Sequence, residues 1–269
     1  MKNYVNTDKL IKLYDDLVQF ALDDIVARIV QNEVITGAAE FRIWKLQQLG
    51  IHLEKIKDYI KKMTKFSDEE IENIFETAGI TLYKPVTNLF IDQKTNFPLN
   101  LESSQYFRDV FSYYLSSTKG TVHNLTRTTA ISSQNLLINK LDQVHFRVVS
   151  GIQSYSQAIS EAIDEIGKSS LKVVYPSGHQ DSVDVAVRRA VVTGVNKCFS
   201  DLNLIRAKQN GYNHVLVSSH LGARHVENPS PEYLSHDIWQ GKVYKVDWDT
   251  VPFVKIHMNF SPAPPERAI

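Results

Sequence analysis

The chain has 269 residues, 43% of them hydrophobic, which is enough for a sizeable core in one large domain or two modest ones. Its 30 Lys and Arg residues balance its 30 Asp and Glu residues, so a strong overall attraction to nucleic acid is not expected. A single cysteine excludes an internal disulfide and a multi-cysteine zinc site, and no apolar run reaches the ~18 residues of a membrane span, so we expect a soluble protein from a reducing compartment.

Four helices with short turns are predicted over residues 1–82, as an N-terminal helical bundle. The first follows Thr7 as its cap and continues at helical spacing to about residue 34. The second ends at Gly50, and the third covers residues 51–63. The fourth begins at a capping box, Ser67-Asp-Glu-Glu, and ends at a glycine.

Residues 83–100, which contain two prolines, are the predicted linker. A second helical region, 101–166, follows with helices over 101–115, 121–149 and 154–166. The segment SSTKGTVHN separates the first two of these helices. The Thr- and Ser-rich stretch TRTTAISSQN is poor in strong helix formers, so we expect it to contact other subunits or to line a polar surface.

A small α+β domain is predicted over residues 167–250. It places a long helix, from Ser182 to Gly211, on one sheet built from the strands LKVVY, HVLVSS and KVYKV. Asp184 lies in the first turn of that helix, where the helix dipole favours a negative charge. The predicted fold class is therefore α+β, with a mainly helical N-terminal region and a small C-terminal helix-on-sheet domain. Residues 251–269 are expected to be a flexible tail.

Three blocks within this domain, GHQDSVDVAVRRAVVTGVN, VSSHLGARH and HDIWQGKVY, occur in order with a predicted helix and strand between them. In these blocks the chain resembles the phage minor capsid protein 2 family, which is related in layout to Mu F-like head-morphogenesis proteins. After WQGKVYKVDWDT the family usually continues with a Gly-rich segment and an Asn-Cys-Arg-His type motif, which this chain lacks. The signature residues are Gly178, Asp184, Arg188, Arg189, Thr193, Asn196, His220, Gly222, Arg224, His225, His236, Trp239, Gln240, Gly241 and Lys242.

The resemblance implies a structural virion protein without catalytic residues, metal or cofactor, located in the capsid interior or at the portal vertex. During assembly it would be in the bacterial cytoplasm. Its implied partners are the portal protein or the inner capsid surface, with packaged DNA and further copies of the chain as additional candidates and no membrane. Implied roles are head assembly and DNA packaging or ejection.

Two alternatives stay open from the residues themselves. The histidines and Arg224 could form the site of a hydrolase, nuclease or ADP-ribosyltransferase-like effector, although the segment HLGARH itself contains no carboxylate for general acid–base chemistry. Arg188 and Arg189 could bind DNA phosphates without sequence preference, or one of them could lock the helix to the following strand through backbone carbonyls or Asp184. Cys198 lies on the apolar stripe and is expected to be a buried, inert thiol.

Overall fold

The computed structural model describes residues 5–31, 35, 37–91, 105–175, 178–209, 214–216, 225, 227 and 240–245, and for residues 79–91, 106, 206, 209, 215, 216 and 244 the backbone only. The elements are α1 Asp8–Val30, α2 Ala38–Ile91, α3 Gln105–Val149, α4 Tyr155–Gly167, β1 Lys172–Val174, β2 Gln180–Ser182, α5 Val183–Gln209, β3 His214–Leu216 and β4 Val243–Lys245. Helices dominate, and the strands form short antiparallel pairs. The predicted class, a mainly helical α+β protein, is confirmed.

The chain forms two compact units, each made from two separate stretches. The first unit, called the bundle below, comprises Met1–Lys84 and Ser112–Val195. The second comprises Pro85–Phe111 and Asn196–Ile269. The bundle therefore contains α1, α4, β1, β2, most of α2 and α3, and the first half of α5. Residues that the sequence analysis assigned to separate N-terminal and C-terminal regions lie together in it.

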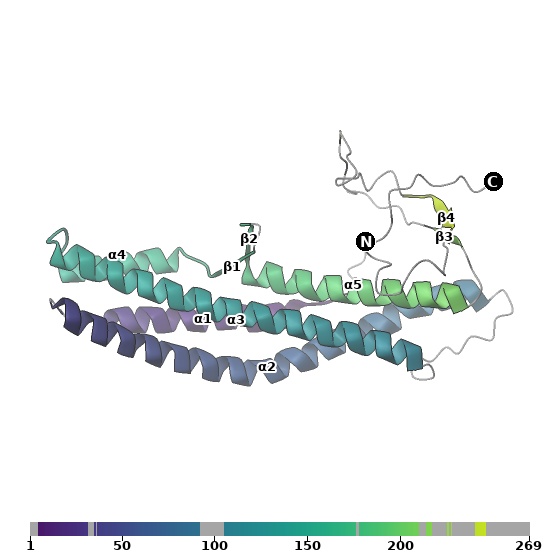
Figure 1. Ribbon diagram of the computed structural model, residues 1–269, viewed down its shortest axis with the longest axis horizontal. Coiled ribbons are helices and arrows are strands. Elements are labelled where there is room, and N and C mark those ends of the chain that lie inside the picture. Colours follow the sequence, from purple (N-terminus) through teal and green to yellow (C-terminus); the bar gives the residue numbers. More distant parts are fainter. Residues whose placement is uncertain are drawn as a thin grey trace. The chain divides into compact units, whose positions relative to one another are not determined.

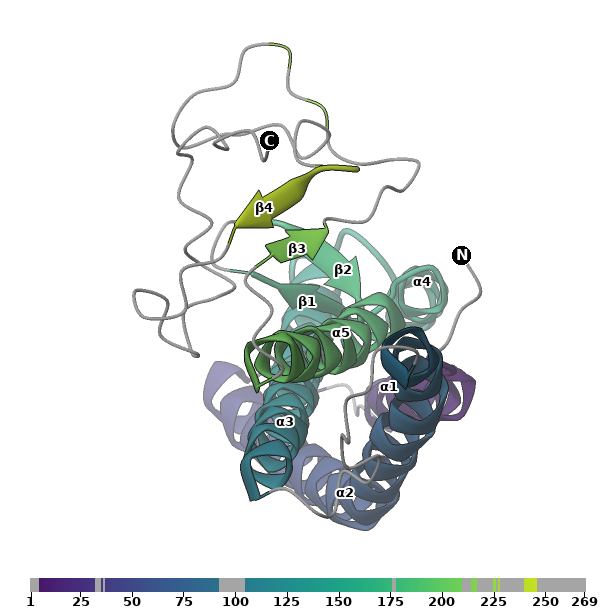
Figure 2. The same cartoon turned by 90° about the vertical axis from the view of Figure 1, so that its right-hand side faces the viewer.

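Three long helices, α1, α2 and α3, run through the bundle, and α4 and α5 follow one another along the side opposite α2 (Figures 1 and 2). An ion pair between Lys140 and Glu165 ties α4 to α3. Gly194 of α5 lies against Thr118 of α3. Two successive helices thus take the fourth position of the bundle, and the β1–β2 hairpin stands between them.

The part of the bundle that holds α4 has an apolar core, made by the apolar stripes of α1, α2, α3 and α4. A capping box starts α4: the Ser154 hydroxyl accepts from the Gln157 N–H, and the Gln157 side chain accepts from the Ser154 N–H. The buried members of this core are Ile25, Ile29, Phe41, Leu49, Leu137, Leu141, Val144, Ala158, Ala162 and Ile166. On α5 the buried residues of the bundle are smaller: Val183, Ala186, Val187, Val191 and Val195.

The predicted helix ends at Gly50 and at residues 63–67 are wrong, because α2 is one continuous helix that also covers the start of the predicted linker, through Ile91. A glycine inside a helix costs only about 0.5–1 kcal/mol, which packing along a long apolar stripe exceeds. Ser67 does not cap a helix; its side chain is buried in the middle of α2. The remainder of the predicted linker and the predicted tail, 251–269, lie outside the described residues.

The predicted break in SSTKGTVHN is also wrong, since α3 continues through it. Hydroxyl groups in this region bond back to carbonyls one turn earlier, Thr121 to Ser117 at 2.9 Å and Thr129 to Leu125 at 2.9 Å, so they do not compete with the helix. The Thr and Ser residues of this part of α3, including those of TRTTAISSQN, do not serve only an outer surface. Thr118, Thr126, Thr129 and Ser133 are buried inside the bundle of this same chain.

Strand pairing differs from the single predicted sheet. Among the described residues β1 pairs with β2, with Val173 opposite Asp181, and β3 pairs with β4, with Val215 opposite Tyr244. The sequence analysis did not predict β2, because its residues, Gln180–Ser182, lack the apolar and β-branched side chains that indicate a strand. They pair because the turn at Gly178 returns the chain onto β1.

Candidate functional site

The structure locates part of the signature set. Asp184 lies in the first turn of α5, and Arg188, Arg189, Thr193 and Asn196 are exposed along the same helix. His225 and Lys242 are exposed, Gln240 is half-buried, and Gly241 has a positive φ of 67°. Five of the predicted residues lie outside the described part of the chain: His220, Gly222, Arg224, His236 and Trp239. A site formed by the histidines and Arg224 therefore remains a prediction.

The β1–β2 hairpin turns through Gly178, whose φ of 81° is a conformation that side chains other than glycine disfavour. The Gly178 N–H donates to the Tyr175 carbonyl at 2.8 Å, and the Tyr175 N–H donates to the His179 carbonyl at 2.9 Å. The Tyr175 and His179 rings stack with their centroids 5.9 Å apart. Backbone bonds and a ring stack thus fix the shape of this turn.

Arg189 fastens the hairpin to α5. Its guanidinium donates to both carboxylate oxygens of Asp181 in β2, at 2.6 and 3.4 Å, rather than to Asp184 or to the strand that follows. His179 Nε2 lies 3.1 Å from the same carboxylate. Burial alone would raise the pKa of Asp181, but bonds from His179 and Tyr175 and the charge of Arg189 outweigh it, so the pKa lies below its usual range. Asp181 is therefore a carboxylate anchor for the turn.

Replacing Arg189 by alanine is expected to loosen the hairpin while leaving the bundle folded. The amide hydrogens of Tyr175 and Gly178 should exchange faster, because their turn loses its tie to α5. The matched control is Arg188→Ala, since Arg188 is exposed beside it and makes no ion pair within the described residues. Equal exchange rates in the two variants would contradict this role for Arg189.

Cys198 is fully buried on α5. Burial, with a smaller contribution from the charge of Asp201, raises the pKa of its thiol to about 12, so almost no thiolate exists near neutral pH. We expect no reaction with an aromatic disulfide reagent at pH 8 in the native protein and one equivalent of reaction in denaturant. Rapid labelling of the native protein would show that Cys198 is accessible.

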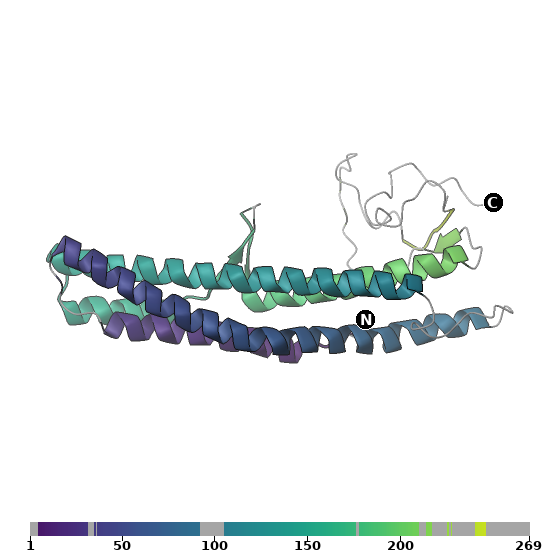
Figure 3. The same ribbon diagram turned by 60° about the horizontal axis from the view of Figure 1, so that its bottom comes forward.

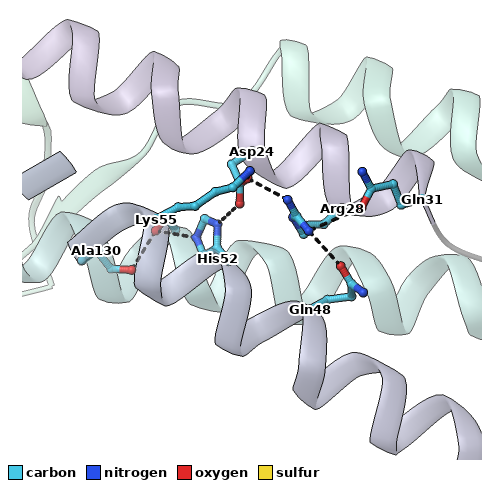
Figure 4. Close-up of polar contacts among 8 residues, drawn as sticks. Asp24, Arg28, Gln31, Gln48, His52, Lys55 and Ala130 are labelled. Carbon is cyan, nitrogen blue, oxygen red and sulfur yellow. Dashed lines mark hydrogen bonds and ion pairs between the residues drawn. The ribbon is translucent and has the colours of Figure 1, made fainter. Parts of the chain in front are cut away.

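The most extensive polar arrangement of the described residues lies elsewhere, inside the bundle between α1, α2 and α3 (Figure 4). We call it the buried polar cluster. It consists of Asp24, Arg28, Gln48, His52, Lys55 and Ser133. All but Lys55, which reaches the surface, are buried, and His52 is fully buried.

Asp24 is the centre of this cluster. It accepts from Lys55 Nζ at 2.8 Å, from His52 Nδ1 at 2.9 Å and from Arg28 Nη2 at 3.3 Å. Burial disfavours its charge, but the bonds from Lys55 and His52 and the charge of Arg28 prevail and lower its pKa. Arg28 also reaches Gln48 Oε1 at 3.3 Å. The Asp24 carboxylate of α1 thus bonds to α2 through two donors, His52 and Lys55, and Arg28 of α1 adds the contact with Gln48 of α2.

His52 has a partner for each ring nitrogen in either protonation state. Burial lowers its pKa and outweighs the opposing effect of Asp24, so the ring is neutral near pH 7. The neutral ring donates from Nδ1 to Asp24 and accepts at Nε2 from the Ser133 hydroxyl, 3.1 Å away. When protonated, it donates to Ser133 Oγ, whose proton turns to the Ala130 carbonyl at 2.8 Å. Both ring nitrogens of this fully buried histidine are therefore occupied by partners within the bundle.

The sequence analysis missed this cluster, although a signal was present. Six of the buried residues of α1 alternate at spacings of four and three, as in the seam of a helical bundle, and Ile25 and Ile29 are buried beside them. The six are Leu10, Tyr14, Leu17, Ala21, Asp24 and Arg28. Asp24 and Arg28 occupy seam positions, where a charge requires a buried partner. The sequence analysis relied on the broader apolar stripe of this helix and assigned no role to Asp24 or Arg28.

Within the described residues, no three His, Cys, Asp or Glu side chains are placed to hold a metal ion. None of the described helices is long and apolar enough to cross a membrane. The polar groups described above bond to one another, either inside the bundle in the buried polar cluster or between the β1–β2 hairpin and α5.

The polar groups of the described residues thus tie elements of the bundle to one another. Comparison with protein families gives the class of protein: residues 4–250 match the model for "Phage minor capsid protein 2". The chain therefore belongs to the phage minor capsid protein 2 family, as its motifs had indicated.

A relative is a "Structural protein" of Lactococcus phage LL-H, 21% identical over 200 residues. The alignment covers 71% of this chain and 53% of that protein, so this chain spans about half the length of the relative. No solved structure matches the chain.

Proposed function

We propose that the protein attaches to the portal or to the inner capsid surface of a tailed phage or prophage head, where it assists head assembly or DNA packaging and ejection. The observation that carries this proposal is the family match over almost the whole chain, from residue 4 to residue 250. The match includes the helical bundle as well as the C-terminal motifs, so the bundle is part of the sequence that the family shares.

The chemistry of the described residues supports a structural role. Arg189 is paired with Asp181, and the charged members of the buried polar cluster are paired with Asp24. Exposed apolar side chains, including Leu46 and Phe146, are available for contact with other proteins. A protein that works by contact needs such a surface on a rigid frame, and the bundle provides both.

Co-purification with the portal protein encoded by the same genome tests the proposal. The two proteins would be co-expressed with a tag on the portal only, and the untagged chain would be measured in the eluate at moderate salt. Retention at a fixed ratio to the portal subunit is the expected result. The major capsid protein, tagged in a parallel experiment, distinguishes the portal from the inner capsid surface. Failure to bind either would refute the proposal.

A further inference from the structure

The outer side of α2 carries lysines that do not hold the bundle together. This helix runs along the side of the bundle away from α5, which Figure 3 turns towards the viewer. Between residues 57 and 65 every exposed residue of α2 is charged, and four of the five are lysines: Lys57, Asp58, Lys61, Lys62 and Lys65. No apolar side chain is exposed within this stretch, so its surface is a charged one.

Lysines elsewhere in the bundle tie one helix to another. Lys45 of α2 pairs with Asp142 of α3, and Lys140 of α3 pairs with Glu165 of α4. The lysines of residues 57–65 make no such tie. Two of them approach only a glutamate of α2 itself, at 3.7 and 4.0 Å, and the other two have no ion pair within the described residues. Exposed pairs of this kind contribute little, so the stability of the bundle does not depend on these four lysines.

The acidic residues that follow on α2 are used differently. The chain as a whole is neutral, but residues 68–76 contain five acidic residues and no basic one. Two of these, Asp68 and Glu72, are engaged by His123 and Lys119 of α3. Part of the acidic segment is therefore already met by cations of this chain and is a poor counterpart for the lysines of a second copy. The lysines before it are left for an anionic partner outside the chain.

Arg127 of α3 adds a further cation beside these lysines. It lies four residues after His123, which faces Asp68 of α2, so it is on the same side of α3. The contact of Ser133 with His52 joins the two helices again beyond it. Arg127 is exposed between these two contacts, in the interval where α2 carries its lysines, and makes no ion pair within the part of the chain described. We call this set the basic ridge: Lys57, Lys61, Lys62, Lys65 and Arg127.

The spacing of the basic ridge suits a regular array of negative charges. Lys57, Lys61 and Lys65 recur every four residues, about 6 Å apart along the helix axis, in a row roughly 12 Å long. Duplex DNA carries one negative charge about every 1.7 Å of its axis, so this row can meet several phosphates at once. Each lysine is a point charge on a flexible stem, which suits contact with phosphates at any sequence. Two exposed carboxylates, Glu54 and Asp58, lie among the lysines, so the attraction is moderate.

We propose that the basic ridge of α2 and α3 binds the phosphate backbone of duplex DNA without sequence preference. The choice of DNA among polyanions rests on the proposed function, because DNA is the polyanion packaged in a phage head. The ridge is a different site from the arginine pair on α5. There Arg189 is held by Asp181, whereas the ridge lysines hold no other element.

Fluorescence anisotropy of a labelled duplex of mixed sequence, titrated with the full chain, tests this site. We expect binding whose logarithm falls against the logarithm of salt concentration with a slope of about −3 to −5, since each neutralised phosphate contributes about −0.9. Replacing Lys57, Lys61 and Lys65 together by glutamine should weaken binding at least about tenfold at low salt and flatten the slope by about 2 to 3. The circular dichroism spectrum should not change.

The matched control replaces Lys12, Lys168 and Lys172 by glutamine. These three are also exposed and without an ion pair in the described ranges, so the control removes the same charge elsewhere on the bundle. Equal binding by the two triple variants, or no binding by the wild type, would overturn the proposal. Displacement of the duplex by polyglutamate at equal charge concentration would assign the ridge to an acidic protein and overturn it as well.

Portal co-purification separates this proposal from the proposed function. The Lys57, Lys61 and Lys65 triple variant should still be retained by the portal, because it loses phosphate contacts only. A wild-type protein that is retained by the portal but does not bind the duplex would refute the DNA site and leave the proposed function intact. A protein that binds the duplex through the basic ridge but neither the portal nor the major capsid protein would refute the proposed function instead.

Discussion

Replacing Asp24 by alanine is expected to destabilise the protein by about 3–5 kcal/mol, the cost of leaving the buried Arg28 guanidinium without its carboxylate and the buried His52 ring without its acceptor. Arg28 has a 7% exposed side chain and His52 has none, so neither can reach water when the carboxylate is removed. Lys55 can turn outwards, since its side chain is 48% exposed, and it contributes least to the loss. Urea unfolding followed by circular dichroism measures the change.

Asp23 provides the matched control. It is the same residue type, adjacent in sequence, but exposed and bonded only to Gln19 among the contacts described. Its replacement by alanine should change the free energy of unfolding by less than about 0.5 kcal/mol. If Asp24→Ala were as mild as Asp23→Ala, the buried polar cluster would not hold the bundle together.

The cluster also predicts a pH dependence. Burial keeps the pKa of His52 below its ordinary value near 6.5, so in the window just below pH 6.5 the unfolded chain binds more protons than the folded one. The free energy of unfolding therefore falls as pH falls through that window. Asp24, whose pKa is also lowered, adds a second loss below about pH 4.

Comparing wild type with His52→Gln isolates the first of these effects. The variant loses contacts and is less stable at every pH, but the slope of its stability between pH 7 and 5 should be smaller, because the titrating ring is gone. The other histidines contribute equally to both profiles. Parallel profiles would show that His52 does not titrate in this range.

The sequence predicted short elements with local end signals better than it predicted how far the long helices continue. α4, from Tyr155 to Gly167, was predicted within a residue because a cap and a compact apolar stripe define it locally. The ends predicted at Gly50 and near Ser67 failed because a long helix packed along its whole length overrides local signals. The interior of the bundle was the hardest part. Buried Thr118, Thr126 and Ser133 look like surface residues until the neighbouring helix that faces each of them is known.

The environment of Gly194 also depends on a residue that is distant in sequence, and we expect a large loss of stability when this glycine is replaced. Gly194→Ala should destabilise the protein by about 1–3 kcal/mol, although alanine is normally the better helix former. A Cβ atom there would overlap the Thr118 hydroxyl and stand 3.1 Å from the Thr118 Cβ and 3.2 Å from its Cγ2. Thr118 is buried and β-branched, so it has little freedom to move aside.

Gly120→Ala is the control for this prediction, because Gly120 lies in α3 with nothing within 4 Å of an added Cβ. It should stabilise the protein by about 0.5–1 kcal/mol, the usual gain for replacing an exposed helical glycine. In a double-mutant cycle, Thr118→Ala should recover most of the loss caused by Gly194→Ala, because it removes the overlapping hydroxyl and methyl groups. Additive effects would mean that α3 and α5 do not meet at these two residues. Non-additive effects would establish that α5 packs on α3 through this close contact, which larger side chains at position 194 could not allow.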